Sequence, residues 1–137
     1  MSQTRFATAL IAIAFMSSAC GDDETSEALE IEGVWLSNFS TTDTITSTMF
    51  NSQTIISFSN SENFAITQNP PDDAFFPDKF SRIVWTEPAN DTFFYCTIDF
   101  GLDTAAEAEN SPNVADATDP ETMGCGTFPW TRLERAP

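Results

Sequence analysis

The sequence predicts a mostly β fold, built as one domain with one disulfide. From Gly33 onward, short runs rich in Phe, Ile, Val, Trp and Thr alternate with clusters of Asn, Ser, Asp and Pro. This alternation is typical of antiparallel strands joined by turns. The 118 residues from Cys20 to Pro137 are enough for one modest hydrophobic core.

Seven runs have the composition of β-strands. They cover residues 34–39, 44–50, 54–59, 64–68, 80–86, 92–100 and 128–133. The polar clusters 60–63 and 87–91 predict hairpin loops, the first between the third and fourth runs and the second between the fifth and sixth. After the sixth run, Thr104 and Glu107 have the spacing of a capping box. With the alanines at 105, 106 and 108, they predict one short helical turn.

The run 92–100 predicts which of its side chains face the core, because strand side chains alternate between two faces. One face carries Phe94, Cys96, Ile98 and Phe100, and the other carries Phe93, Tyr95, Thr97 and Asp99. We expect the first set to face the core, which would place Cys96 inside the domain.

Cys96 and Cys125 form an even pair in a chain that we expect to be exported, which predicts one disulfide between them. A metal site is the alternative for the same pair. The chain has no histidine and no Cys-x-x-Cys motif, and two thiolates do not complete a tetrahedral zinc shell.

Three architectures satisfy the strand pattern: a single antiparallel β-meander that forms a small barrel, a β-sandwich, and another β-meander or α+β arrangement. Gly33-Val34-Trp35, at the start of the first run, resembles the opening Gly-x-Trp of lipocalin-like barrels. In that family a basic residue near the last strand packs over the tryptophan, and the resemblance gives this role to Arg132. It also implies a closed barrel, which has no exposed edge strands.

Residues 1–19 predict a signal peptide. Arg5 precedes an uncharged apolar run at 6–16. Eleven helical residues rise only about 16 Å, about half of a hydrocarbon core, which is typical of the apolar region of a signal peptide. Ser17-Ser18-Ala19-Cys20 resembles the lipobox of bacterial lipoproteins, with Ser17 where leucine is usual. The resemblance implies cleavage before Cys20 and lipidation of its thiol. The alternative is a plain secretory signal that leaves Cys20 as a free thiol.

Residues 20–32 are polar and acidic, and we expect a flexible tether before a β-rich domain at 33–137. A first helix starting near Ser26 is the alternative, although it would have no apolar face. After cleavage, four basic residues remain against twenty-one acidic ones, a net charge of −17. Such a chain repels phosphates, which excludes nucleic acid as a partner. We expect contact with a membrane only through the N-terminal lipid. Gly21, which follows the cysteine, favours the outer membrane, on its periplasmic or surface face.

No motif predicts catalysis or a cofactor, and we expect the chain not to be an enzyme. Without histidine, a serine or cysteine nucleophile lacks its usual base. A calcium site is the alternative for the acids of the loops 72–78 and 116–121. However, Asp116, Asp119 and Glu121 do not have EF-hand spacing. A solvated acidic surface accounts for them, so we expect no metal.

Aromatic residues are the best candidates for a binding site. Most of them must build the core. Phe75 and Phe76 lie in the proline-rich segment 69–78, which cannot pair inside a sheet. Phe93 and Tyr95 lie on the second face of their run. We expect these four to be partly exposed, where they could contact a small apolar ligand, a sugar or a protein. The alternative for Phe75 and Phe76 is a plug over one end of the core.

Two functions follow from these features. The first is a lipid-anchored envelope lipoprotein with a non-enzymatic binding or structural role, which contacts other envelope proteins through a surface patch. The second is a lipocalin-like carrier with an apolar pocket for a small ligand. An internal cavity would favour the carrier, and a filled core would favour the surface binder. The order of Gln68-Asn69-Pro70, Phe94-Tyr95-Cys96 and Gly124-Cys125-Gly126 resembles a set of bacterial lipoproteins without an assigned activity.

Overall fold

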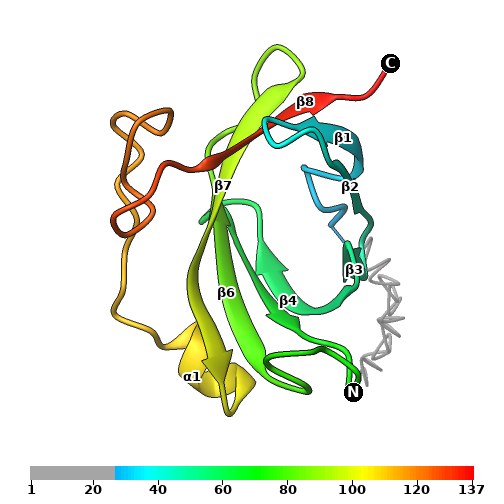
Figure 1. Cartoon of the computed structure of the whole chain (residues 1–137), viewed down its shortest axis with the longest axis vertical. Coiled ribbons are helices and arrows are strands. Elements are labelled where there is room, and N and C mark those ends of the chain that lie inside the picture. Colours follow the sequence, from blue (N-terminus) through cyan, green and yellow to red (C-terminus); the bar gives the residue numbers. More distant parts are fainter. Residues whose placement is uncertain (1–26) are drawn as a thin grey trace, which may run out of the picture.

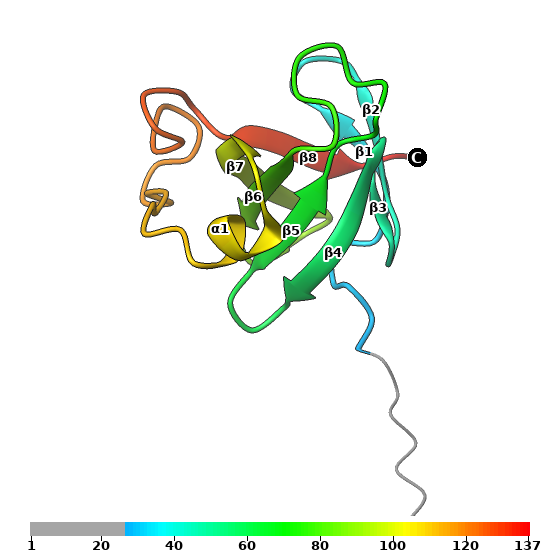
Figure 2. The same ribbon diagram turned by 90° about the horizontal axis from the view of Figure 1, so that it is seen from below.

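A computed structural model describes residues 27–137, which form a closed barrel of eight antiparallel strands. The strands follow one another around the barrel in chain order, and β8 pairs with β1 to close the ring (Figure 2). They are β1 (Gly33–Ser37), β2 (Thr42–Ile45), β3 (Met49–Phe50), β4 (Gln53–Ser59), β5 (Phe64–Gln68), β6 (Phe80–Trp85), β7 (Thr92–Leu102) and β8 (Thr131–Arg135). The mostly β fold and the small barrel are therefore confirmed, and the sandwich is wrong.

The barrel has eight strands, one more than the predicted seven, because the run 44–50 divides into β2 and β3. The hydroxyl of Thr46 accepts hydrogen bonds from the backbone N–H groups of Thr48 and Met49, at 3.3 and 3.0 Å. These bonds stabilise a turn in the middle of the run. The last strand also begins later than predicted, because Phe128 forms a turn with Cys125 instead of pairing with a strand.

The predicted helical turn is confirmed as α1 (Ala105–Glu109), and its capping box is present. The N–H of Glu107 donates to the Thr104 hydroxyl, and the N–H of Thr104 donates to the Glu107 carboxylate, both at 3.2 Å. Ala108 packs on Phe64 and Ile66, so the helix covers the outer face of β5. In residues 27–137 no helix is long and apolar enough to cross a membrane.

The prediction of which β7 side chains face the core is wrong. Phe93 and Tyr95 point into the barrel, where Phe93 lies edge-on to Trp35 with ring centroids 4.7 Å apart. Cys96 is buried on the outer face, where it forms the predicted disulfide with Cys125. The alternation of side chains did not distinguish the two faces because both are covered, the inner by the core and the outer by the segment that follows α1.

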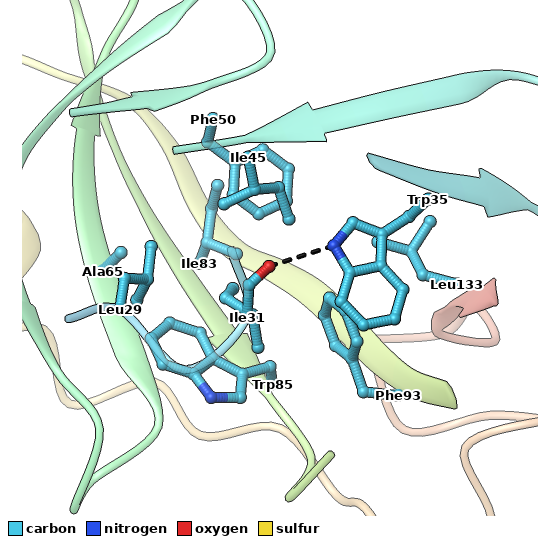
Figure 3. Packing of buried hydrophobic residues seen from close by; sticks show 10 residues of the cluster. All are labelled: Leu29, Ile31, Trp35, Ile45, Phe50, Ala65, Ile83, Trp85, Phe93 and Leu133. Atoms are coloured by element: carbon cyan, nitrogen blue, oxygen red, sulfur yellow. Dashed lines mark hydrogen bonds between the residues drawn. The ribbon is translucent and has the colours of Figure 1, made fainter. Parts of the chain in front are cut away.

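Residues 29–32 belong to the barrel, so the predicted tether is too long. Leu29 and Ile31 are fully buried in the main core. Figure 3 shows this core, which consists of Leu29, Ile31, Trp35, Ile45, Phe50, Ala65, Ile83, Trp85, Phe93 and Leu133. We call residues 28–32 the plug. The signal peptide, Cys20 and the start of the tether lie outside the described residues.

Polar contacts fix the plug from several strands. The indole N–H of Trp35 donates to the carbonyl of Ile31 at 3.0 Å, the dashed line in Figure 3. The indole N–H of Trp85 donates to the Glu30 carboxylate at 2.6 Å. The Asn60 amide donates to the carbonyl of Ala28 and accepts from the N–H of Glu30, at 2.7 and 3.0 Å. These bonds satisfy polar groups that enter the core with Leu29 and Ile31.

Arg135 covers Trp35 from outside the core. Its guanidinium carbon lies 3.9 Å from the centroid of the Trp35 ring, and it donates to the carbonyl of Glu32 at 3.0 Å. Gly33 makes room for it, since a Cβ there would lie 1.9 Å from the guanidinium. The sequence assigned this role to Arg132, which instead pairs with Glu134 at 2.5 Å.

The two ends of the barrel differ. Because the strands run up and down, the loops 60–63 and 86–91 share one end with the plug, which we call the plugged end. The loops 38–41, 51–52 and 69–79 lie at the opposite end, which we call the open end.

Leu29→Ala is expected to lower the free energy of unfolding by about 2–5 kcal/mol, because it removes a buried side chain and leaves a cavity. Leu36→Ala makes the same change at an exposed position of β1 and is expected to cost less than about 1 kcal/mol. Urea unfolding followed by tryptophan fluorescence measures both. Equal effects would show that the plug does not belong to the core.

Candidate functional site

A cavity of about 350 Å³ lies at the open end of the barrel. Its lining combines aromatic rings with amide and hydroxyl groups. The lining residues are Phe50, Asn51, Ser52, Gln53, Asn69, Asp73, Phe75, Phe76, Ile83, Tyr95 and Thr97. They come from β3, β4, β6, β7 and the loops 51–52 and 69–79, so six parts of the chain build one site.

Hydrogen bonds within the loop 69–79 hold its aromatic pair in place. The Asp73 carboxylate accepts from the N–H groups of Phe76 and Phe75, at 2.7 and 3.0 Å. These two bonds, chiefly the one from Phe76, hold the pKa of Asp73 below its ordinary value. The Asn69 amide donates to the carbonyl of Phe76 at 3.1 Å and accepts from Gln53 at 2.5 Å. The loop is thus anchored to β4.

Phe75 and Phe76 occupy different environments. Phe76 is 39% exposed, and its ring packs on Phe100 with centroids 5.5 Å apart. It also lies over Gly101, where a Cβ would come within 2.9 Å of the ring. Phe75 is 84% exposed. Phe75 therefore does not plug the core, because it points into solvent, whereas Phe76 packs on Phe100 beside the cavity.

Tyr95 forms part of the inner wall of the cavity. Its ring lies edge-on to Phe50 with centroids 5.1 Å apart, and its hydroxyl donates to the Asp43 carboxylate at 3.4 Å. Asp43 is itself buried. Burial, and secondly the negative charge of Asp43, raise the pKa of Tyr95 to about 12. The phenol is therefore neutral throughout the physiological range.

The structure brings together three of the four predicted contact residues. Phe75, Phe76 and Tyr95 line the cavity, whereas Phe93 packs against Trp35 in the core and does not reach it. Sequence reasoning missed Phe50, Gln53 and Asn69. The alternation of residues 53–59 offered one signal, because it places the polar Gln53 on the same face as the apolar Ile55.

The acidic loop 116–121, the alternative calcium site, is organised by its own turns. The Asp116 carboxylate accepts from the N–H of Thr118 at 2.9 Å, and hydrogen bonds with Thr118 lower the pKa of Asp116. The Asp119 carboxylate accepts from the Thr122 hydroxyl at 2.8 Å. Within residues 27–137, no group of three or more His, Cys, Asp or Glu side chains is placed to hold a metal ion.

Tyr95 is the only tyrosine of the chain, so its titration can be followed by tyrosinate absorbance. In the native protein we expect a midpoint near 12, against about 10 in urea. The raised pKa contributes stability that is fully present below pH about 10 and is lost as pH rises through 12. Asp43→Asn is expected to lower the native midpoint but to leave it above the unfolded value, because burial is the larger cause. Equal midpoints in native and unfolded protein would contradict the buried position of the phenol.

The chain was compared with known proteins at three levels. No family model, no curated protein and no solved structure matches it. The function proposed below therefore depends on the geometry of the barrel and its open end.

Proposed function

We propose that the chain is a non-enzymatic binding protein of the cell envelope, anchored by lipid on Cys20, which holds a partner protein at the open end of its barrel. One observation carries the proposal: the core is closely packed from the plugged end, while the open end presents an exposed aromatic side chain on a fixed loop. The chain binds through its surface and encloses no large ligand.

The packing of the core at the plugged end favours a protein that binds through its surface over a carrier that encloses its ligand. Sites for small molecules are usually concave, enclose most of the ligand and have largely apolar walls. Here the plug and the rings of Trp35, Trp85 and Phe93 pack together at one end of the barrel. The remaining space is a cavity of about 350 Å³ at the open end, and amide groups that already form hydrogen bonds within the chain make up part of its wall.

Phe75 has the properties of an anchor for a protein partner. A side chain that is 84% exposed would gain apolar burial only on contact with another molecule. The bonds from Asp73 fix the backbone at this position before binding. Such preorganisation reduces the entropy lost on association, and aromatic anchors often dominate the binding energy of an interface.

Lipid on Cys20 would attach the domain at its plugged end. The nine residues from Cys20 to Leu29 reach at most about 30 Å even when fully extended. The plugged end therefore stays near the membrane, and the open end is available to a partner in the periplasm or outside the cell. The chain carries a large negative charge, so electrostatic attraction to anionic head groups does not draw Phe75 back to the lipid.

A small-ligand site is the second candidate. The cavity of about 350 Å³ lies at the lower end of the range for such sites, and Phe50, Phe75 and Tyr95 offer rings on which a small apolar molecule or a sugar would stack. Native mass spectrometry of delipidated protein from its own host distinguishes the candidates. A retained small-molecule mass would favour this second function.

The partner-binding proposal predicts position-specific crosslinking in the envelope of the host. A photoreactive phenylalanine analogue at position 75 should yield a discrete crosslinked protein. The same analogue at position 56, an exposed isoleucine of β4 that lines neither the open end nor any other proposed contact, serves as the control. Once the partner is identified, Phe75→Ala should weaken its binding by about 2 kcal/mol, roughly thirtyfold. Crosslinks at position 75 to lipid alone would rule out the proposed role of the open end.

Lipidation predicts that protein extracted from membranes begins at Cys20 and carries added acyl mass in intact-mass analysis. Cys20→Ser should remove that mass and leave the protein uncleaved or released from the membrane. Two or more acyl chains give stable anchoring, whereas one gives reversible binding. A wild-type protein that is fully released and starts at another residue would contradict the anchor.

A further inference from the structure

The strand β7 is longer than the strand that pairs with its outer edge. β8 pairs only with residues 92–95 of β7, and its register ends at Tyr95 and Thr131. Pro129 has no N–H, and the N–H of Trp130 donates to the carbonyl of Pro120 instead of to β7. The chain therefore leaves β7 at this point, and no strand of residues 27–137 pairs with Cys96–Leu102 on that side.

The register shows which main-chain groups are left unpaired. The N–H of Thr86 donates to the carbonyl of Phe94, so the main chain of Phe94 points toward β6. Residues alternate in an antiparallel ladder, and the pairing from Tyr95 to Thr97 is regular. The N–H and C=O of Thr97 therefore point away from β6, where no backbone group of the described chain bonds to them. The register with β6 shifts directly after Thr97, which marks a β-bulge, so Thr97 is the position of this edge where an added strand would pair.

A groove of about 520 Å³ runs along this edge. The edge of β7 forms one wall, and the segment after α1 forms the other. The lining residues are Thr97, Ile98, Phe100, Asn113, Val114, Cys125, Gly126, Thr127 and Phe128. Figure 1 shows this segment, drawn in yellow to orange, beside β6 and β7 before it returns to β8. Val114, Phe128 and Phe100 are 90%, 71% and 62% exposed, so apolar side chains line an open groove.

The outer wall of the groove is fixed. The disulfide joins Cys125 to β7, and Cys125 and Phe128 exchange two backbone hydrogen bonds, at 3.0 and 3.1 Å. The Asn113 amide donates to the Asp99 carboxylate at 2.7 Å, which holds the far end of the groove. These bonds fix the position of Cys125 and Phe128 relative to β7, so the groove has a defined outer wall.

The negative charge of the domain indicates what kind of partner would bind in the groove. Residues 27–137 hold eighteen acidic and four basic side chains. Each of the four bases already contacts a group of its own chain: Lys79 with Asp103, Arg82 with the carbonyl of Glu109, Arg132 with Glu134, and Arg135 with the ring of Trp35. The segment beside the groove adds Asp116, Asp119 and Glu121, with no base between them. The field at the groove therefore favours a positively charged partner.

We propose that the edge of β7 from Thr97 to Phe100 is a second binding site, which takes up an extended, basic segment of a partner protein as an added strand. Main-chain hydrogen bonds form with Thr97, and alternate apolar side chains enter the groove between Val114 and Phe128. The basic side chains in between face solvent and the acidic loop. This mode of recognition uses the main chain for affinity and alternate pockets for specificity. The site lies outside the barrel, so it does not depend on the open end.

The probe for the test is a synthetic peptide of about eight residues that alternates valine with lysine. Its binding to the full chain in detergent is measured by fluorescence anisotropy, and we expect a Kd in about the micromolar range. N-methylation of one alternate set of amides should weaken binding at least about tenfold, and N-methylation of the other set should have little effect. Such asymmetry reports main-chain pairing along one edge. Equal effects of the two sets, or no binding of the parent peptide, would overturn the proposal.

Two protein variants locate the peptide. Phe128→Ala should weaken binding about tenfold, and Phe75→Ala at the open end should leave it unchanged. The reverse result would place the basic segment at the open end, which overturns the second site and leaves the proposed function standing. A block peptide of the same composition, with the lysines grouped, is expected to bind at least about tenfold more weakly, and equal binding would reduce the interaction to charge alone and overturn the site.

Discussion

The barrel depends on the insertion of two apolar residues, Leu29 and Ile31, from a segment that precedes the first strand. Both side chains are fully buried, and they occupy the space that would otherwise open between Trp35 and Trp85. The indoles that pack against them also bond to the plug, one at the carbonyl of Ile31 and the other at the carboxylate of Glu30. Apolar burial and hydrogen bonding thus act on the same short segment. A barrel of this size buries few other apolar side chains that could replace the contribution of Leu29 and Ile31.

This arrangement gives the molecule two unlike ends. The plugged end gathers the N-terminal segment, the C-terminal residues of β8 and the Arg135 side chain over Trp35. The open end retains a cavity and carries Phe75 on a loop that Asp73 and Asn69 hold. The outer face beside β7 is a third environment, where the disulfide ties the segment after α1 to the sheet and a groove lies between them. The proposed anchor, partner contact and added strand therefore involve separate surfaces.

Local patterns in the sequence predicted most of the fold. Strand composition located the sheet, the spacing of Thr104 and Glu107 located α1, and an even cysteine count gave the disulfide. The errors arose where a decision depended on distant contacts. Both faces of β7 are covered, so alternation could not show whether Phe93 or Cys96 faces the core. Leu29 and Ile31 stand among acids, and only the cavity that they fill identifies them as core. Phe75 and Tyr95 were recognised as candidates, but the polar residues beside them come from other strands and meet only after the barrel closes.

The position of the plug also determines how the domain responds to mechanical tension. A force applied along the chain from the N-terminus reaches residues 28–32 before it reaches any strand. The hydrogen bonds from Asn60, Trp35 and Trp85 share that force, together with the apolar contacts of Leu29 and Ile31. Extraction of the plug would expose two indoles to water while the ladder between β1 and β8 is still intact. Residues 28–32 are therefore expected to detach under tension before the barrel opens. Their detachment would change the environment of Trp35 and Trp85.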